Sequence, residues 1–548
     1  MRGPTNLIVS VLLVAAACGG GSDDDAILVI GPPDAVLTVS PGVSASQAYT
    51  ATLTQPDGST RDVTATTQFM VDASAVGAFD AATFTANGNR GGRLVVTARH
   101  DDLTATANLM VKFENVIVTT GTPSDAADHF GGPADTSLNM TWAYPESGVR
   151  VPPNLMLFEY QWNNPANNDL FELHYINEVT DVRIYTTTPS YQADPSTWTV
   201  LAETNRGGDL QVALRGTHYA GGGVGEAPPI SVGYSEQDVA GGIYYWAAAN
   251  ESIMRFDFGT PAQAPEQFYT SAMAGGRCVS CHAVSRDGSK MALNLYVNSD
   301  PYGGGILDIS SRTLLADNNY KAVFQTYSPD SRLLVTSWQG VLSLRDGQTG
   351  ADKGVIPTGG FATQPDWSSD GTRLVYVSAP SGTDRSFMSG SIVTIPWDGT
   401  AFGAPETIVP AGSENNFKPT FSPDGAWIIF NRSTGDSDVD SDARLLGIRL
   451  SDRAIVELDR ASGPTGSADS WARWSPFVQE HRGGKLMWFT FSSSRAYGNR
   501  LPAGRPQIWM TAFDPDHPTD PTFPPLWVPF QDMSTGNHIA QWTTQILL

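Results

Sequence analysis

The sequence predicts an all-β protein that is divided into several domains. Its 548 residues include 54 Gly and 37 Pro, and charged residues make up only 16% of the chain. This composition favours short strands joined by turns over long helices. Many segments alternate apolar and polar residues between turn signals, and the second half of the chain repeats one strand pattern several times. A chain of this length has room for two to four domains, each with its own core.

The first 25 residues have the pattern of a secretory signal followed by a flexible tether. Arg2 precedes the apolar run LIVSVLLVAAAC, which is too short to span a membrane comfortably, and GGGSDDD follows it. The small residues before Cys18 resemble the lipobox of bacterial lipoproteins. This resemblance implies cleavage before Cys18 and a lipid anchor on its thiol; an ordinary signal peptide with a free Cys18 is the alternative. Because Gly19 follows rather than Asp, we expect a place in the cell envelope at the outer membrane or surface.

Two β-sandwich domains are expected after the tether. Residues 26–113 contain strand patterns such as AVLTVSPG and GRLVVTARHDDLTATANLMV at the spacing of a sandwich. The order of YTATLTQPDGSTRDVT, a small-residue middle and LTATANLMV resembles the bacterial Ig-like group 2 domain. Residues 115–229 hold further segments of strand composition, including LFELHYI, WTVLAE and DLQVALRGTHY, and are loosely similar to a fibronectin-type or Ig-like sandwich. The group 2 resemblance implies a spacer or adhesive unit, and neither segment shows residues in a chemical arrangement.

A repeated turn-and-strand pattern dominates residues 230–548. The copies AVSRDGSKMALNLY, TYSPDSRLLVTSW, DWSSDGTRLVYVS and TFSPDGAWIIFNR share an apolar or aromatic residue, Ser, any residue, Asp, and Gly or Ser before a strand. The Asp-Gly pair predicts a tight turn, and the residue before Ser should pack between neighbouring sheets. With degenerate copies at 473–491 and 540–548, the pattern predicts six inner strands. It resembles the TolB-like six-bladed β-propeller, a relative of the WD40-like propellers.

The last predicted inner strand lies too close to the C-terminus to complete its own sheet. Its missing strands must come from elsewhere in the chain, and the hairpin GGIYYWAAANESIMRFDF at 241–258 is the expected donor. One blade would then be shared between the two ends of the propeller sequence, which closes the ring and hides the sheet edges.

A CxxCH box, formed by Cys278, Cys281 and His282, directly precedes the first repeat. This spacing matches the attachment motif of c-type cytochromes, in which two thiols bind the haem vinyl groups and the histidine ligates the iron. The resemblance implies one covalent haem c. A disulfide between Cys278 and Cys281, a zinc site and a thioredoxin-like pair are the alternatives, but zinc would lack ligands and no βαβ pattern surrounds the box. The box also departs from cytochrome c domains, because a propeller strand begins three residues after His282.

The repeat alignment places the box at one mouth of the propeller channel. It makes His282 equivalent to the strand-entry residues Gln325, Pro365, Pro419, Ala472 and Ala540. His538 falls level with Ser280 on the last blade and is the candidate sixth iron ligand, which would make His282 and His538 the metal-binding residues. Met273, on a Gly-rich loop, is the second candidate, and Met291 is expected to pack in a strand.

Two functions from different classes follow from these features. The first is an exported lipoprotein that presents haem c at the rim of a propeller for electron transfer or for redox or small-ligand binding. The alternative is a non-enzymatic binding or scaffold lipoprotein of the cell envelope whose propeller binds a protein partner, with CxxC as a disulfide. The net charge of −23 argues against nucleic acid or anionic lipid as a partner, so contact with the membrane is expected only through the lipid anchor. The aspartates of TGDSDVDSD, at 434–442, are interpreted as a solvated loop rather than a cation site.

Overall fold

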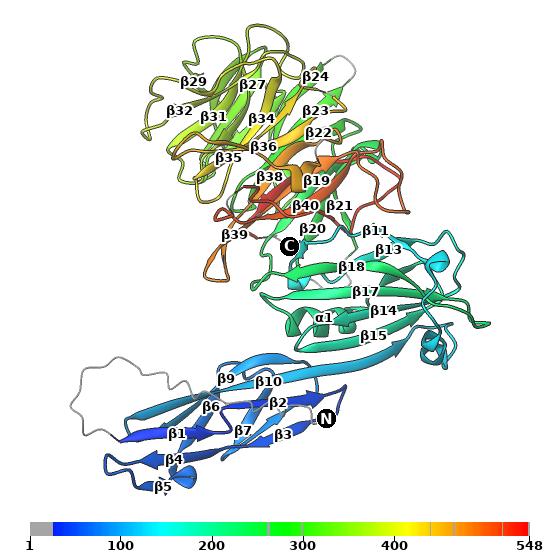
Figure 1. The fold of residues 1–548 in the computed structure, drawn as a ribbon. Helices are drawn as coiled ribbons and strands as arrows, with labels where there is room; N and C mark the ends of the chain where they lie inside the picture. The colour runs from blue at the N-terminus through cyan, green and yellow to red at the C-terminus, as the bar shows by residue number, and fades with distance from the viewer. Residues whose placement is uncertain are drawn as a thin grey trace. The chain divides into compact units, whose positions relative to one another are not determined.

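The structure is a computed structural model that describes residues 26–259, 264–297, 300–438, 440–463, 466–517 and 519–545. The signal segment predicted at 1–25, with Cys18, lies outside the described residues. Contacts divide the chain into two compact units, 1–113 and 114–548, each of which is described by itself. Strands dominate both units (Figure 1). Among the described residues, no helix is long and apolar enough to cross a membrane.

The first unit consists of short strands in layered sheets. The sheet orders are β1-β4-β5, β3-β8-β7 and a larger one in which β10 pairs with β2 in parallel and with β9 antiparallel, while β9 also pairs with β6. Aromatic rings of Tyr49, Phe69, Phe79 and Phe84 pack together between these sheets. The bounds are β1 Ile27–Gly31, β2 Asp34–Val39, β3 Ala45–Ala48, β4 Thr50–Thr54, β5 Thr60–Asp62, β6 Gln68–Val71, β7 Gly77–Asp80, β8 Thr83–Ala86, β9 Gly92–His100 and β10 Leu103–Val118.

The middle part of the chain forms two sheets and one helix. One sheet contains β12-β18-β17-β14-β15 and the other β11-β13-β16. The bounds are β11 Thr141–Tyr144, β12 Val149–Val151, β13 Glu159–Asn163, β14 Leu170–Ile176, β15 Thr180–Thr186, β16 Ser190–Gln192, α1 Pro195–Thr204, β17 Asp209–Thr217 and β18 Gly225–Tyr234. Since β18 continues to Tyr234, this part extends beyond the expected boundary at 229.

The segment WTVLAE, which its composition predicted as a strand, lies in helix α1. Asp194 caps this helix by accepting hydrogen bonds from the backbone N–H groups of Ser196 and Thr197, and Pro195 occupies the first turn. Trp198 is buried and donates from its indole N–H to the Pro153 carbonyl at 2.6 Å. The cap and this anchor therefore override the weak strand propensity of Thr and Val.

Six four-stranded sheets form the blades of a propeller, as the repeats predicted. Blade 1 contains β22 Cys278–Val284, β23 Lys290–Val297, β24 Asp300–Asp308 and β25 Thr313–Lys321. Blade 2 contains β26 Phe324–Tyr327, β27 Leu333–Trp338, β28 Val341–Asp346 and β29 Asp352–Val355. Blade 3 contains β30 Ala362–Trp367, β31 Arg373–Ser378, β32 Ser391–Pro396 and β33 Glu406–Val409. Blade 4 contains β34 Asn415–Phe421, β35 Trp427–Ser433, β36 Arg444–Arg449 and β37 Ile455–Glu457, followed by the short helix α2 Asp459–Ser462.

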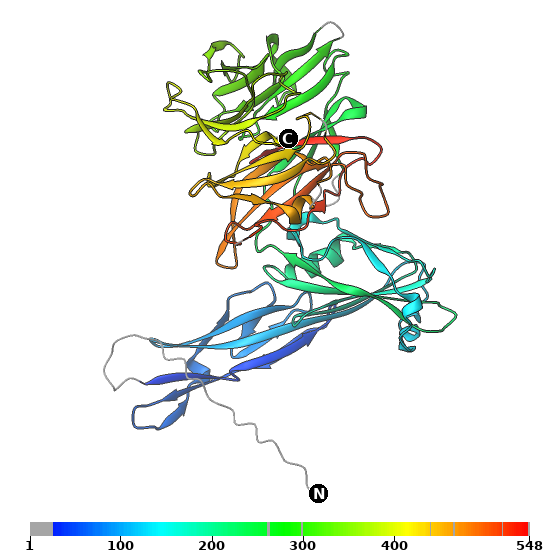
Figure 2. The same ribbon diagram turned by 45° about the horizontal axis from the view of Figure 1, so that its top comes forward.

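The two ends of the propeller sequence share the last blade. Blade 5 contains β38 Ser470–His481, β39 Gly484–Ser493, β40 Gln507–Phe513 and β41 Leu526–Trp527. Blade 6 is built from β19 Gly242–Ala247, β20 Ser252–Asp257 and β21 Glu266–Tyr269 together with β42 Asn537–Thr543. β42 pairs antiparallel with β19 and also contacts the inner strands β38 and β22, which closes the ring as predicted. In Figures 1 and 2 the red C-terminal strand accordingly lies against green strands that precede the first repeat.

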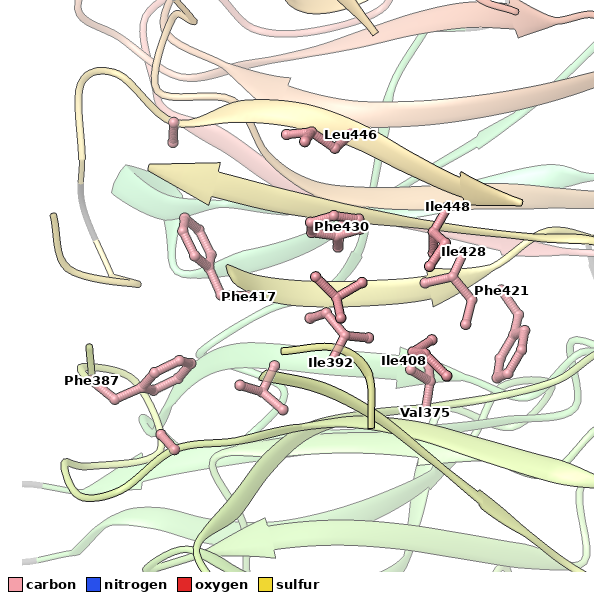
Figure 3. Packing of buried hydrophobic residues seen from close by; sticks show 14 residues of the cluster. Val375, Phe387, Ile392, Ile408, Phe417, Phe421, Ile428, Phe430, Leu446 and Ile448 are labelled. Carbon is pink, nitrogen blue, oxygen red and sulfur yellow. The ribbon is translucent and has the colours of Figure 1, made fainter. Parts of the chain in front are cut away.

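The turn of each repeat is stabilised by the same local hydrogen bonds. In four repeats the Ser hydroxyl donates to the Asp carboxylate two residues later at 2.6 Å and accepts the backbone N–H five residues later at 2.8 to 3.0 Å. The residue before Ser packs between blades: Phe421 lies in a cluster that joins strands of blades 3 and 4 (Figure 3). The tight turn and the packing of this residue are thus confirmed.

The middle part also contacts the propeller. The Glu159 carboxylate is buried and pairs with Arg500 at 2.5 Å, while the Tyr497 hydroxyl donates to it at 3.0 Å. Arg482 on the β38–β39 turn pairs with Asp209 at 2.9 Å. These contacts attach the middle part to blade 5.

Candidate functional site

The CxxCH box lies in β22, the inner strand of blade 1, in an extended conformation. Ser280 pairs with Asn294 and His282 with Leu293, so Cys281 is the extra residue of a β-bulge. The other residues of the box keep their places in the β22–β23 ladder. The three side chains that could bind a haem therefore lie on a strand and not in a compact haem-binding loop.

His282 is wedged between blade 1 and blade 6. Its side chain is only 4% exposed, and its Nε2 lies 3.0 Å from the backbone carbonyl of Tyr244 in β19. Because a carbonyl only accepts, Nε2 carries the proton and Nδ1 is the unprotonated nitrogen. Nδ1 is buried and has no hydrogen-bond partner. Burial lowers the pKa of His282 to about 4, so the imidazole is neutral at neutral pH.

The two cysteines of the box are free, and the disulfide alternative is wrong for this structure. Residues three apart in an extended strand have Cα atoms ~10 Å apart, whereas a disulfide requires about 4.4 to 6.8 Å. The thiols also have different surroundings. Burial and then Glu251 raise the pKa of Cys278, while burial raises that of Cys281 against the opposing charge of Arg385. Both thiols are therefore protonated and lie in different environments.

The residues of the box do not fit a haem as β22 is folded. The cavity lined by Cys281 and His282 has a volume of about 20 Å³, which suffices for about one water. His282 is held in the blade interface by its hydrogen bond to the Tyr244 carbonyl. Covalent attachment would require the first half of β22 to leave its sheet.

The candidate distal ligands lie in different surroundings. His538 lies in β42 opposite Trp246, with ring centroids 5.9 Å apart, and burial lowers its pKa to about 4. Met273 is 45% exposed on the turn before β22, whereas Met291 is fully buried in the core, as expected. Over the part of the chain that the structure describes, no group of three or more His, Cys, Asp or Glu side chains is placed to hold a metal ion.

Six residues, one from each inner strand, lie one position before the aligned entry positions. We call them the channel plug: Cys281, Phe324, Gln364, Lys418, Trp471 and Ile539. All but Lys418 line the small cavity beside His282, and Lys418 lies over the Trp471 ring. Four of these residues have left-handed backbones, with φ of +53° at Gln364, +51° at Lys418, +56° at Trp471 and +53° at Ile539. Such values are costly for non-glycine residues and require support from the surrounding structure.

Contacts across the channel provide this support. The rings of Phe324 and Trp471, from blades 2 and 5, have centroids 5.0 Å apart. The Lys418 ammonium lies 4.9 Å from the Trp471 ring centroid and 5.1 Å from that of Phe417. Gln364 accepts the backbone N–H of Lys418 at 2.7 Å, and its own Nε2 is buried without a partner. The sequence alignment predicted the strand-entry residues but not the plug. The plug residues directly precede these entry residues in each repeat, and this position was the signal that could have identified them.

Lys418 gives the plug a positive charge that is largely removed from water. The residue is 4% exposed, and burial lowers its pKa to about 8. Several charged groups act on it from neighbouring loops and strands: Asp438 and Asp436 favour its charged form, and Arg385 and Arg473 oppose it. Asp438 is itself paired with Arg385 at 3.1 Å, and Asp436 accepts a hydrogen bond from the Ser386 hydroxyl.

An aromatic cavity of about 310 Å³ lies beside the plug, lined by Tyr302, Val323, Trp338, Phe361 and Arg385 among others. The rings of Tyr302 and Trp338 have centroids 5.1 Å apart. Val323 directly precedes Phe324 of the plug, and the charge of Arg385 acts on both Cys281 and Lys418. The plug and the aromatic cavity therefore belong to the same end of the channel.

The chain is a six-bladed β-propeller protein. No protein-family model and no curated protein matches it. It is similar to the crystal structure of TolB from Acinetobacter baumannii, with 16% identity over 61% of this chain and 79% of that chain and a TM-score of 0.39. It is also similar to hydrazine synthase of Kuenenia stuttgartiensis (13% identity, 51% of this chain, 73% of that chain, TM-score 0.31) and to the Swd1 propeller domain of Myceliophteria thermophila (9%, 53%, 88%, 0.31). At this level of similarity, the fold assignment rests on the six sheets themselves.

Proposed function

We propose that this chain is an exported, lipid-anchored protein of the bacterial cell envelope whose propeller binds a protein partner. The sequence supports export through the signal pattern at 1–25, with Cys18 as the lipid-bearing residue. The strongly acidic composition disfavours nucleic acid and anionic membrane surfaces as partners. The repeats resemble TolB-like propellers, and this resemblance implies a role in protein binding rather than catalysis.

The aromatic cavity beside the channel plug is the observation that carries this proposal. Trp and Tyr side chains around a concave site, with an arginine at its edge, are the residue types that supply most of the binding energy in protein interfaces. Tyr302 and Trp338 are both partly exposed, so they can contact a partner without unfolding a blade. The rigid inner strands next to them hold such a site in a fixed geometry.

Haem c on Cys278, Cys281 and His282, with His538 opposite, is the second candidate and rests on the sequence motif alone. The two free thiols are compatible with thioether attachment. The extended conformation of β22 and the wedged imidazole speak against it. Partner binding is therefore the first candidate function, and electron transfer is the second.

The partner site is tested with the full-length protein in a bacterium that exports lipoproteins. Tagged wild type, Trp338→Ala and the control Tyr219→Ala, which removes an exposed aromatic ring from the middle part, are cross-linked in cells, and recovered proteins are quantified by mass spectrometry. We expect a partner that wild type and Tyr219→Ala recover equally and that Trp338→Ala loses by tenfold or more. Equal recovery by all three proteins would place the partner elsewhere on the chain and refute the proposed site.

A further inference from the structure

A second cavity lies inside the channel, at the end that carries the turns of the repeats. This inner chamber has a volume of about 110 Å³ and is lined by residues from all six inner strands, including Pro476 of β38, and by the turn prolines Pro329 and Pro423. Arg473, Gln325 and Gln541 also line the small cavity beside Cys281 and His282, so they mark the boundary between the two ends of the channel.

Two arginine side chains converge on this chamber from different blades. Arg473 comes from β38 of blade 5, and its Nη1 donates to the backbone carbonyl of Ala472 at 2.9 Å. Arg286 comes from the turn after β22 of blade 1 and reaches Ser369 of blade 3, donating to its carbonyl at 2.9 Å. Among the described residues, neither guanidinium has a carboxylate within ion-pair distance. Both residues line the chamber, and each guanidinium carries five N–H donors, so donors remain for a ligand there.

One acidic side chain, Asp366, shares the chamber with the two arginines. Its Oδ2 accepts from the Thr420 hydroxyl at 3.0 Å and from the backbone N–H of Phe421 at 2.9 Å. The carboxylate is therefore held against blade 4 instead of pairing with an arginine. Two positive charges and one negative charge leave the chamber with an excess of one positive charge, in a protein whose net charge is −23.

A partly buried cation without an ionic partner loses part of its hydration, which is energetically unfavourable. Burial accordingly lowers the pKa of both Arg473 and Arg286, and Asp366 is the group that opposes this effect in each case. An anion between the two guanidinium groups would restore charge balance and accept hydrogen bonds from both. The hydroxyl of Thr326 and the amide of Gln541 line the same space and add further donors.

We propose that the inner chamber binds a small oxyanion or a carboxylate group between Arg473 and Arg286. The volume of about 110 Å³ has room for several waters, and thus for a phosphate, a sulfate or a single carboxylate. The anion comes either from a free ion or from a carboxyl group on a peptide that enters past the turn prolines. This site lies at the opposite end of the channel from the aromatic cavity and does not depend on the partner proposed there.

Titration calorimetry on the full-length protein tests the site, at constant ionic strength maintained with chloride. The probes are inorganic phosphate, sulfate, acetate, and triglycine as the free acid or as the C-terminal amide. We expect at least one anionic probe to bind saturably. We expect its affinity to fall by tenfold or more in Arg473→Gln and in Arg286→Gln, while Arg473→Lys retains part of it. The control Arg453→Gln, which removes a surface arginine paired with Glu406 at 2.7 Å, should bind as the wild type does.

The different probes distinguish the two sources of the anion. Binding of phosphate or sulfate identifies a free oxyanion, whereas binding of triglycine acid but not of its amide identifies a peptide carboxylate. If no probe binds saturably, or if both glutamine variants bind with wild-type affinity, the inference is wrong. A glutamine variant that fails to fold, as judged by circular dichroism, leaves the decision to the other glutamine variant and to Arg473→Lys.

Discussion

Acidification should destabilise the propeller through His282, and the effect can be isolated by one substitution. In the folded protein the neutral imidazole donates from Nε2 to Tyr244 across the interface of blades 1 and 6, while Nδ1 is buried without a partner. A second proton on Nδ1 would place an uncompensated charge between two blades, near the positive charge of Arg473. Protonation therefore favours the unfolded state, in which His282 titrates normally.

The size of this effect follows from linkage between protonation and folding. The pKa of His282 is lowered from 6.5 to about 4, so its contribution is fully present above pH 6.5 and is lost as the pH falls from there to 4. A shift of this size corresponds to about 3.4 kcal/mol once the pH is below both values, at 1.36 kcal/mol per pKa unit. Between pH 7 and pH 5 the expected loss is about 2 kcal/mol.

The measurement compares urea unfolding of wild type and His282→Gln at pH 7 and pH 5, followed by tryptophan fluorescence. Glutamine retains an N–H donor for the Tyr244 carbonyl but does not titrate. Other groups, including His538 and His481, contribute equally to both proteins and cancel in the difference. We expect wild type to lose about 2 kcal/mol more than the variant over this interval. The same pH dependence in both proteins would refute the buried, neutral imidazole.

Two further predictions concern the shared blade and the box. Trp542 of β42 is buried, stacks on Phe258 at 5.1 Å and donates to the Thr490 hydroxyl at 3.0 Å, so Trp542→Ala should lower the free energy of unfolding by about 3 to 5 kcal/mol. Thermal unfolding of the variant measures this loss, and an unchanged melting temperature would show that β42 does not close the ring. For the box, protein exported from a host with the c-type maturation system should show neither the mass of a haem nor a c-type α band, and two thiols should react after unfolding. A haem mass that disappears in the double variant Cys278→Ser/Cys281→Ser would instead establish haem attachment. It would also mean that the Cys278–His282 segment does not adopt the strand conformation described here.

Local features of the sequence predicted most of the propeller. The Ser and Asp of each repeat stabilise the turn within a few residues, so their pattern survives in the sequence and locates every inner strand but the degenerate ones. The shared blade followed from strand counting, because β42 cannot complete a sheet by itself. Helix α1 was missed although its signal, Asp194 followed by Pro195, was present as a cap. The composition of this segment favours a strand, whereas the cap favours a helix, and the cap decided the conformation.

The plug and the inner chamber could not be derived in the same way. Phe324 and Trp471 contact each other across the channel although they are far apart in the sequence. Four plug residues have left-handed backbones, and no local sequence pattern predicts this conformation. Arg286 and Arg473 likewise belong to different blades and converge only when the ring closes. Such sites depend on the geometry of the whole ring and not on a motif.

The position of the CxxCH box in the propeller explains its three residues separately. Cys281 occupies the plug position that the other blades fill with Phe, Gln, Lys, Trp and Ile. His282 occupies the next position, where its imidazole bonds to Tyr244 and joins blade 1 to blade 6. Cys278 begins the strand opposite Tyr296, in the neighbourhood of Glu251. A haem site requires these residues to act on one ligand, whereas β22 directs them to a channel, a blade interface and a strand end. In this conformation of β22 the three residues therefore do not meet at one site.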